Sequence, residues 1–360
     1  MTDAPAPRPR ATLGALPAYA AGKPPTPRPG MTTYKLSSNE NPFPPLPGIE
    51  EAVARAAARM NRYPDAGSTA LYAALAARLG VATEQLAAGT GSVAVLYHLL
   101  QAFCDPGDRV VTAWRSFEAY PIAIGINAAE PVQVPLTADG RHDLDAMAAA
   151  AAEPRTKVVV LCTPNNPTGP ALTHGEVEDF LARVPGEVLV VVDEAYREFV
   201  RLEGAVDGVA LLAEHPNVVV MRTFAKAYGL AGLRVGYAVA HPDVAAAIRA
   251  CALPFGVSAP AQAAAVAALE HEAELMERVE AIVTERERVV EALTAQGWDL
   301  PETHANFVWL ATGERTADLV TAAEEAGIVL RPFAGEGVRA SIGEREANDR
   351  LVEVAAKFVP

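Results

Sequence analysis

Short apolar runs and longer amphipathic segments alternate between about residues 45 and 245. The runs predict six strands: RVVTA (109–113), PVQVPL (131–136), KVVVLCT (157–163), EVLVVVDE (187–194), NVVVMRT (217–223) and RVGYAVA (234–240). Helical periodicity predicts helices over residues 49–60, 68–79, 92–103, 143–152 and 174–183. Because several runs are apolar at consecutive positions, we expect strands buried on both faces of a mostly parallel sheet covered by helices. The predicted class is α/β.

The two ends of the chain have different patterns. Residues 1–30 are rich in Pro and Ala and predict an extended arm. Beyond residue 250, the segment 259–296 predicts one long helix or two with a kink. Short strands at 306–310, 327–331 and 337–343 alternate there with helices at 316–326 and 345–358. We therefore expect an N-terminal arm over residues 1–44, which packs near the active site and the small domain, a large domain over 45–250, and a smaller α+β domain over 251–360.

Composition excludes several classes of protein. The 360 residues are 51% hydrophobic and carry a formal net charge of −14, which argues against nucleic acid as a partner. We expect no membrane span, because no apolar run reaches about 18 residues. The three cysteines are an odd number without a CxxC pair, which favours neither a disulfide framework nor a metal site. A cytoplasmic enzyme is the expected class.

Polar side chains follow three of the predicted buried strands. Asn166 follows the strand at 157–163, and Asp193 ends the next strand, with Tyr196 three residues later. Thr223 and Lys226 follow the strand at 217–223. Because ligands bind beyond the carboxyl ends of strands in open α/β sheets, we expect these five side chains to lie on one rim.

Lys226 and Asp193 each allow two interpretations. Only 5 of the 30 basic residues are lysines, and the neighbours of Lys226 in RTFAKAYGLAGLR are mostly apolar, small or aromatic. Desolvation would lower the pKa of this amine and make it a nucleophile; the alternative is an ordinary surface lysine. Asp193 is either a helix N-cap or a buried carboxylate that pairs with a cation of a ligand.

The segment beginning at Gly91 predicts an anion site. GTGSVA (89–94) opens the predicted helix at 92–103, where free backbone amides and glycines let a phosphate approach. The same residues match G-x-G-x-x-A, a dinucleotide-binding pattern, but no acidic residue ends the following strand. A single phosphate is therefore favoured, with Arg234 as its bidentate partner. A phosphate site, an amine nucleophile and a carboxylate are the three groups that pyridoxal phosphate requires.

The motifs PNNPTG, DEAY and RTFAKAYGLAGLRVGY resemble those of the fold-type I pyridoxal-phosphate aminotransferases, in particular the histidinol-phosphate and aromatic amino acid group. The similarity extends from LPAY (16–19) and SSNENPF (37–43) through NRYPD (61–65) to VRASIG (338–343). This resemblance implies a mostly parallel seven-stranded sheet between helices, pyridoxal 5'-phosphate as cofactor, and a homodimer with shared active sites.

The resemblance also implies a role for individual residues. Lys226 would form the Schiff base, and Asp193 would pair with the pyridine nitrogen. Tyr196 and Asn166 would contact the phenolic oxygen, and Phe117 would stack on the ring. The phosphate would be held by Gly91, Ser92, Val93, Thr223 and Arg234, with Tyr63 from the second subunit. The substrate would be bound by Tyr19, Arg331 and Arg339, the last of which would take its carboxylate.

Two sequence features bear on the activity. The family usually has Ser directly before the Schiff-base lysine, where this chain has Ala225, so we expect weaker retention of the cofactor. The segment WRSFEAY (114–120) resembles relatives that act on phenylalanine and other aromatic amino acids, with a 2-oxo acid such as 2-oxoglutarate as acceptor. The alternatives are a histidinol-phosphate aminotransferase, a decarboxylase or lyase of the same fold, and a binding module without activity.

Overall fold

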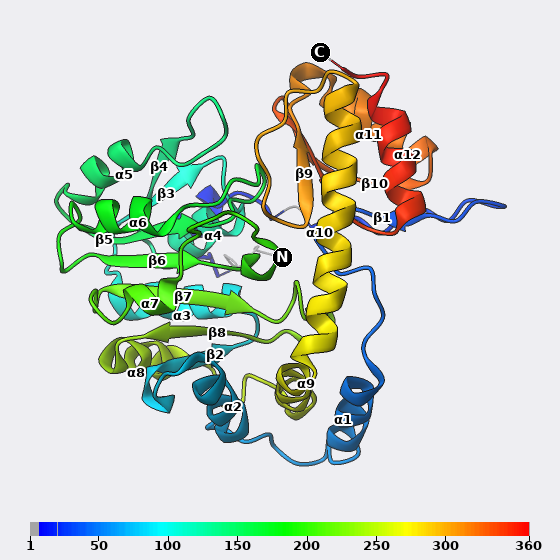
Figure 1. The fold of residues 1–360 in the computed structure, drawn as a ribbon. Helices are drawn as coiled ribbons and strands as arrows, with labels where there is room; N and C mark the ends of the chain where they lie inside the picture. The colour runs from blue at the N-terminus through cyan, green and yellow to red at the C-terminus, as the bar shows by residue number, and fades with distance from the viewer. Residues whose placement is uncertain (1–6, 20, 360) are drawn as a thin grey trace, which may run out of the picture.

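A seven-stranded sheet forms the centre of the protein in a computed structural model, which describes residues 7–19 and 21–359 (Figure 1). The strand order is β2-β8-β7-β6-β5-β3-β4. β8 is antiparallel to both neighbours, and the other pairs are parallel. The strands are β2 (Leu86–Gly89), β3 (Arg109–Trp114), β4 (Glu130–Pro135), β5 (Thr156–Cys162), β6 (Leu189–Asp193), β7 (Val218–Thr223) and β8 (Gly236–Ala240). The predicted α/β class is confirmed.

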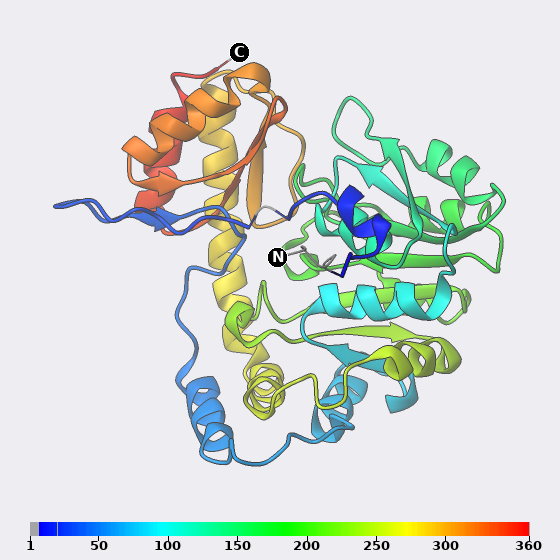
Figure 2. The ribbon, with the colours of Figure 1, turned by 180° about the vertical axis from the view of Figure 1, so that it is seen from behind.

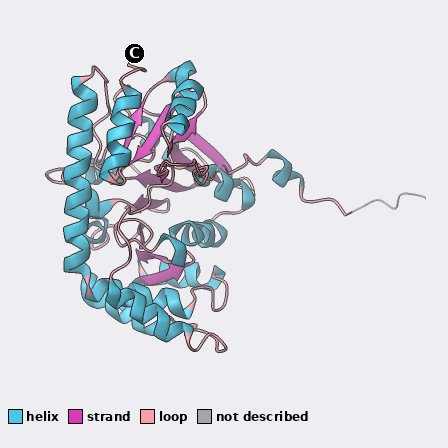
Figure 3. Ribbon diagram, turned by 90° about the vertical axis from the view of Figure 1, so that its right-hand side faces the viewer, coloured by secondary structure: helices cyan, strands magenta, loops and turns pink. Residues whose placement is uncertain are grey.

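Helices cover both faces of this sheet, because its strands carry apolar side chains at consecutive positions. In β6, Val191 packs on one face, whereas Val190 and Val192 pack on the other. The first face is covered by α3 (Ser92–Phe103), α4 (Ala119–Ile126) and α8 (Pro242–Cys251). The second is covered mainly by α5 (Leu144–Ala151), α6 (His174–Leu181) and α7 (Gly208–Leu211). Figure 3 shows strands in magenta with helices in cyan on both sides.

The C-terminal part has a three-stranded antiparallel sheet of its own, in the order β11-β12-β9. These strands are β9 (Phe307–Leu310), β11 (Arg331–Phe333) and β12 (Gly337–Ser341). The prediction of a single strand over residues 327–331 is wrong. The first half of this segment, β10 (Ile328–Val329), pairs with β1 (Tyr34–Lys35), and its end begins β11.

The helices of this part complete the fold. The segment 259–296 forms two helices, α9 (Ala259–Glu270) and α10 (Glu272–Ala295), which meet at His271. Figure 1 shows α10 running upward past the large sheet to the C-terminal strands. The remaining helices are α1 (Pro47–Ala57), α2 (Thr69–Leu79), α11 (Thr316–Glu325) and α12 (Arg345–Ala355). Single 3₁₀ turns are η1 (Ala11–Ala15), η2 (Thr83–Gln85), η3 (Arg197–Phe199), η4 (Ala231–Leu233) and η5 (Gly313–Arg315). Division of the chain near residues 44 and 250 stays a prediction.

The N-terminal segment packs against the large sheet's helices. The Arg10 side chain donates from Nη2 to the carbonyl of Ile126, the last residue of α4, at 2.8 Å. Leu16 lies so close to Gly125 that any side chain at Gly125 would overlap it. Figure 2 shows this blue segment and its 3₁₀ turn lying over the α3 side of the sheet, so the segment is less extended than expected. Residues 1–6 and Ala20 of the predicted arm lie outside the described residues. Within the described chain, no helix combines the length and apolarity needed to cross a membrane.

Candidate active site

A cavity of about 290 Å³ lies at the carboxyl ends of the central strands and is closed on one side by β11 and β12. Most residues that the sequence singled out line it. These are Tyr19, Ser92, Val93, Phe117, Asn166, Asp193, Tyr196, Thr223, Lys226, Arg234, Arg331 and Arg339. The strand-end residues therefore lie together at one rim, as expected. Residues from the N-terminal and C-terminal parts of the chain line the same cavity.

Lys226 lies in the loop after β7 and is partly exposed where it lines the cavity. Its Nζ donates to the Ser38 carbonyl at 3.2 Å. Burial, and then the nearby Arg339 guanidinium, lower the pKa of this amine to about 7. At neutral pH a substantial fraction of Lys226 is therefore unprotonated and able to act as a nucleophile.

Asp193 is the last residue of β6 and is buried. Its Oδ2 accepts a hydrogen bond from the Tyr120 hydroxyl at 2.7 Å. Burial raises the pKa of this carboxyl to about 6, although the Tyr120 hydrogen bond opposes the shift. Its Oδ1 is buried without a hydrogen-bond partner among the described residues. An orphaned acceptor in this position is unfavourable unless a ligand supplies the donor, which argues against the N-cap interpretation.

The start of α3 forms a cradle for an anion. Gly91 is the N-cap, and its φ of 88° lies in the left-handed region that favours glycine. A Cβ at Gly91 would overlap the Arg234 guanidinium, so the glycine keeps that cation close to the helix start. Arg234 itself has a φ of 55°, a conformation that costs a non-glycine residue about 1 kcal/mol and is common at binding sites. Thr223 is buried beside this cradle.

Tyr196 and Arg339 are joined by amide side chains. Asn166 and Asn39 each donate from Nδ2 to the Tyr196 hydroxyl oxygen, at 3.3 and 2.9 Å. Arg339 donates to Asn166 Oδ1 at 2.6 Å and to the Ser37 carbonyl at 2.8 Å. Arg339 Nε is buried without a partner in the described part of the chain. Because guanidinium groups bind carboxylates bidentately, this orphaned donor marks a place for an anionic group.

Tyr63 is not brought to the cavity of its own chain. Its side chain is 82% exposed and stacks on Phe255, with ring centroids 4.6 Å apart. The role expected for Tyr63 was in the site of a second subunit, and the structure contains a single chain. That role stays a prediction.

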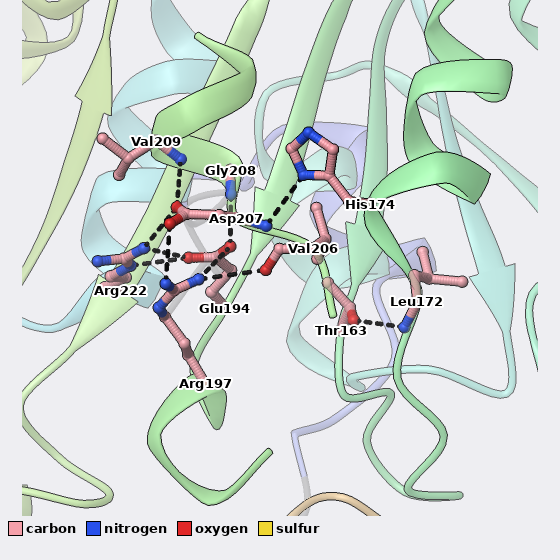
Figure 4. Close-up of polar contacts among 10 residues, drawn as sticks. All are labelled: Thr163, Leu172, His174, Glu194, Arg197, Val206, Asp207, Gly208, Val209 and Arg222. Atoms are coloured by element: carbon pink, nitrogen blue, oxygen red, sulfur yellow. Dashed lines mark hydrogen bonds and ion pairs between the residues drawn. The ribbon is translucent and has the colours of Figure 1, made fainter. Parts of the chain in front are cut away.

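A buried network lies on the other face of the sheet from Asp193 (Figure 4). Glu194 follows Asp193, so its side chain points to the α7 face. Its carboxylate accepts from Arg222 Nε at 2.7 Å and from the Gly208 amide at 2.9 Å. Arg197 adds a contact at 3.5 Å. Glu194, Arg197 and Arg222 are each adjacent in sequence to a residue of the cavity, namely Asp193, Tyr196 and Thr223, so the network fixes the strand ends that present those side chains.

Sequence reasoning missed several residues that line the cavity or contact a residue that lines it. Tyr120 and Glu118 lie in the segment WRSFEAY, which the sequence analysis used only for its resemblance. Asn39 lies in SSNENPF, also quoted only for resemblance, and Phe333 lies at the end of β11. Their polar or aromatic side chains were visible in the sequence. Their approach to Asp193, Tyr196 and Arg331 depends on contacts between distant segments, which no local pattern encodes.

The residues present fit pyridoxal phosphate. The cradle at Gly91 and Arg234 matches a phosphate, the orphaned Asp193 Oδ1 matches a protonated pyridine nitrogen, and the Lys226 amine matches an aldehyde carbon. Across residues 7–19 and 21–359, no three His, Cys, Asp or Glu side chains are placed together to hold a metal ion.

Comparisons with known proteins agree with this geometry. The family described as "Aminotransferase class I and II" matches residues 32–354. An aromatic amino acid aminotransferase of Streptomyces avermitilis is 57% identical over 352 residues, 98% of both chains. One of Thermobifida fusca is 53% identical over 97% of this chain and 96% of its own. The crystal structure of histidinol-phosphate aminotransferase from Sinorhizobium meliloti in complex with pyridoxal-5'-phosphate superimposes with a TM-score of 0.87 at 28% identity, covering 98% of this chain and 97% of that chain.

Proposed function

This chain belongs to the family of class I and II aminotransferases, and from that premise we propose that it moves the amino group of phenylalanine or tyrosine to a 2-oxo acid such as 2-oxoglutarate. Pyridoxal phosphate is the proposed cofactor. The aromatic substrate is supported by the relatives at 57% and 53% identity, which are named aromatic amino acid aminotransferases and align over nearly their full length. The structural neighbour named for histidinol phosphate is only 28% identical.

One observation carries the proposal. Lys226, with a pKa of about 7, and Asp193, with an unpartnered buried oxygen, line the same cavity as the cradle at the start of α3. A surface lysine and a helix cap would not be arranged in this way. Amino-group transfer requires a nucleophilic amine, a buried carboxylate and a phosphate site in one cavity. Their presence together supports an enzyme over a binding module.

When bound, pyridoxal phosphate supplies an electron sink that stabilises the carbanion formed at the substrate Cα. The chain's own residues would do the rest. Gly91, Ser92, Val93, Thr223 and Arg234 would hold the phosphate, Tyr196 and Asn166 would hydrogen-bond to the cofactor's phenolic oxygen, and Phe117 would pack on its ring. Asp193 Oδ1 would accept a hydrogen bond from the protonated ring nitrogen. The positive charge on that nitrogen would lower the pKa of the Asp193 carboxyl, so the carboxylate would stay ionised and keep the nitrogen protonated.

Lys226 has a second task in this proposal. Its Nζ would take the proton from the substrate Cα and deliver it to the C4′ carbon of the cofactor, and would move a proton in the opposite direction in the second half-reaction; the first transfer requires an amine that is unprotonated near neutral pH. Arg339 would hold the substrate carboxylate through its unpartnered Nε and thereby orient the Cα–H bond. Tyr19 and Arg331 would line the region of the substrate side chain. Transfer proceeds in two half-reactions, with release of the first product before the acceptor binds.

We also propose that the enzyme is a homodimer with shared sites. Met60 and Tyr63 are each 82% exposed, and Leu253 is 73% exposed. Large apolar side chains gathered on a surface mark an interaction site. A second copy on this surface would bring the hydroxyl of Tyr63 toward the neighbouring phosphate site. The cytoplasmic location expected from the sequence stays a prediction.

The first half-reaction tests the function. Purified protein loaded with pyridoxal phosphate is mixed with phenylalanine in the absence of an acceptor, and the cofactor's absorption spectrum is followed. We expect conversion to the pyridoxamine form, release of phenylpyruvate in equal amount, and no carbon dioxide. Lys226→Ala is the matched control and should abolish the conversion.

Three other outcomes would contradict the proposal. Released carbon dioxide would indicate a decarboxylase of the same fold. Conversion by histidinol phosphate with none by phenylalanine would indicate the other substrate class. A protein that never takes up pyridoxal phosphate would leave only a binding module.

A further inference from the structure

An ion pair lies in the cavity among the residues expected to bind substrate. Arg331 begins β11 and is buried, and its Nη2 donates to Glu118 Oε2. Glu118 directly follows Phe117 at the start of α4 and is partly buried. Both side chains line the cavity, and the Arg331 guanidinium also lies 5.4 Å from the ring centre of Phe333. In the antiparallel register of β11 and β12, Arg331 stands opposite Arg339.

The charges around the cavity suggest that this ion pair affects which substrate side chain can bind. The ionisable acidic and basic side chains among the described lining residues are three guanidiniums, Arg234, Arg331 and Arg339, the Lys226 amine, and two carboxylates, Asp193 and Glu118. In the proposed function, the cofactor phosphate balances Arg234, and the substrate carboxylate balances Arg339. Arg331 would then present an unbalanced positive charge to the substrate side chain, and it is Glu118 that neutralises it.

We propose that Glu118 is a specificity-determining residue, which holds Arg331 so that the site prefers an uncharged aromatic side chain over an anionic one. This inference rests on the proposed function and deepens it. An aromatic side chain can lie beside the neutral pair and the rings of Phe117 and Phe333. A phosphate or a second carboxylate must first displace Glu118 from Arg331 and is repelled by the freed carboxylate, because like charges at short range are unfavourable in a partly buried site.

The same reasoning applies to the amino acceptor. The second carboxylate of 2-oxoglutarate also competes with Glu118 for Arg331. The ion pair therefore weakens the acceptor's binding while it favours the aromatic donor. Removing the Glu118 charge is expected to lower the KM for 2-oxoglutarate and to leave the KM for phenylpyruvate, which lacks that carboxylate, nearly unchanged.

The test is the isosteric variant Glu118→Gln. The first half-reaction is measured with phenylalanine and with histidinol phosphate, and the ratio of their kcat/KM values is compared with that of the wild type. We expect the ratio to fall at least about tenfold in favour of the phosphorylated donor, the change that one newly available charge-assisted hydrogen bond produces. Glu336→Gln is the matched control, because Glu336 lies in the turn between β11 and β12, pairs with Arg115 and does not line the cavity.

A second variant assigns the effect to Arg331. In the double variant Glu118→Gln with Arg331→Gln, the gain for histidinol phosphate should disappear, because the cation that Glu118 masked is no longer present. A binding measurement separates recognition from chemistry. Calorimetric titration with the unreactive ligands glutarate and 3-phenylpropionate should show tighter glutarate binding in Glu118→Gln, again by about tenfold, with 3-phenylpropionate nearly unchanged.

The outcomes separate this inference from the proposed function. If the wild type converts phenylalanine but Glu118→Gln leaves both the donor ratio and the glutarate affinity unchanged, the inference is wrong and the function stands. The inference is equally wrong if the double variant keeps the gain, or if Glu336→Gln produces the same change. If the wild type does not convert phenylalanine, the proposed function itself fails.

Discussion

At the scale of single residues, the chemistry of the site depends on where a few polar groups are desolvated. Lys226 was predictable because its sequence neighbours are mostly apolar or small, and its pKa of about 7 agrees with that prediction. The contribution of Arg339 to this shift was not predictable, because the two residues are distant in sequence and meet only through the fold. The hydrogen bond from Tyr120 to Asp193 Oδ2, which leaves Oδ1 as the oxygen without a partner, likewise joins residues that are distant in sequence.

The lowered pKa of Lys226 predicts how cofactor uptake depends on pH. Burial depresses the pKa from 10.5 to about 7, so the neutral, nucleophilic amine is lost as the pH falls through 7 and predominates above it. The rate at which the apoprotein binds pyridoxal phosphate covalently should therefore rise with pH and level off above about 8. Stopped-flow absorbance measures this rate. A profile that still rises steeply at pH 9 would mean that the amine is not desolvated.

Ala225 predicts the effect of restoring a hydroxyl. Ala225 lines the cavity at the position where the family usually has Ser. Ala225→Ser should slow the loss of pyridoxal phosphate on dilution by about fivefold, the effect of one net hydrogen bond of about 1 kcal/mol. Ala225→Val adds bulk without a hydroxyl and serves as the control. Equal dissociation rates in Ala225→Ser and the wild type would show that the hydroxyl finds no partner on the phosphate.

At the scale of elements, the helices and strands predicted best are those that a pattern within the segment itself determines. The helix expected at 92–103 is α3 with the same bounds, and the consecutive apolar runs are β3 to β8 within about three residues. β2 was missed because LAAG lacks β-branched residues, and α4 because Pro121 and Gly125 interrupt its helical pattern. The run at 327–331 divides between two sheets, because its first half pairs with β1, which lies far away along the chain, whereas its end begins the hairpin of β11 with β12.

The network behind β6 and β7 predicts a stability effect. Glu194 and Arg222 are buried together, and removing the Glu194 charge leaves the buried guanidinium with the weaker contact to the partly exposed Asp207 at 3.7 Å. Glu194→Gln should lower the free energy of unfolding by about 3 kcal/mol, measured by urea denaturation of the apoprotein. Glu203→Gln, at an exposed loop position, should change it by less than about 0.5 kcal/mol. A similar loss in both variants would mean that the ion pair contributes no more than a surface charge.

At the scale of the whole molecule, the arrangement brings three distant parts of the chain to one cavity. The arm supplies Tyr19, the large sheet supplies the strand-end residues, and the C-terminal sheet supplies Arg331 and Arg339. Most of the site residues that the resemblance implied line this cavity, whereas Tyr63 does not. The sequence did not predict the pairing of Arg331 with Glu118, because that contact joins β11 to the start of α4.

The exposed apolar surface predicts the oligomeric state. Leu253→Glu places a charge two residues from Phe255, whose ring stacks on that of Tyr63, and burying this charge against a second copy would strongly destabilise the dimer. Sedimentation velocity should show a dimer for the wild type and a shift toward monomer for the variant. Ala213→Glu adds the same charge at an exposed position beyond α7 and should remain dimeric. A monomeric wild type, or a dimer unaffected by Leu253→Glu, would contradict the proposed interface.

The central claim is that Lys226 binds pyridoxal phosphate covalently and that phenylalanine releases it. Borohydride reduction followed by peptide mapping tests both parts in one measurement. Without substrate, the reduced cofactor should be found on the peptide that contains Lys226; after incubation with phenylalanine and no acceptor, that label should be lost. A label on another lysine, no label at all, or a Lys226 label that phenylalanine does not remove would contradict the account.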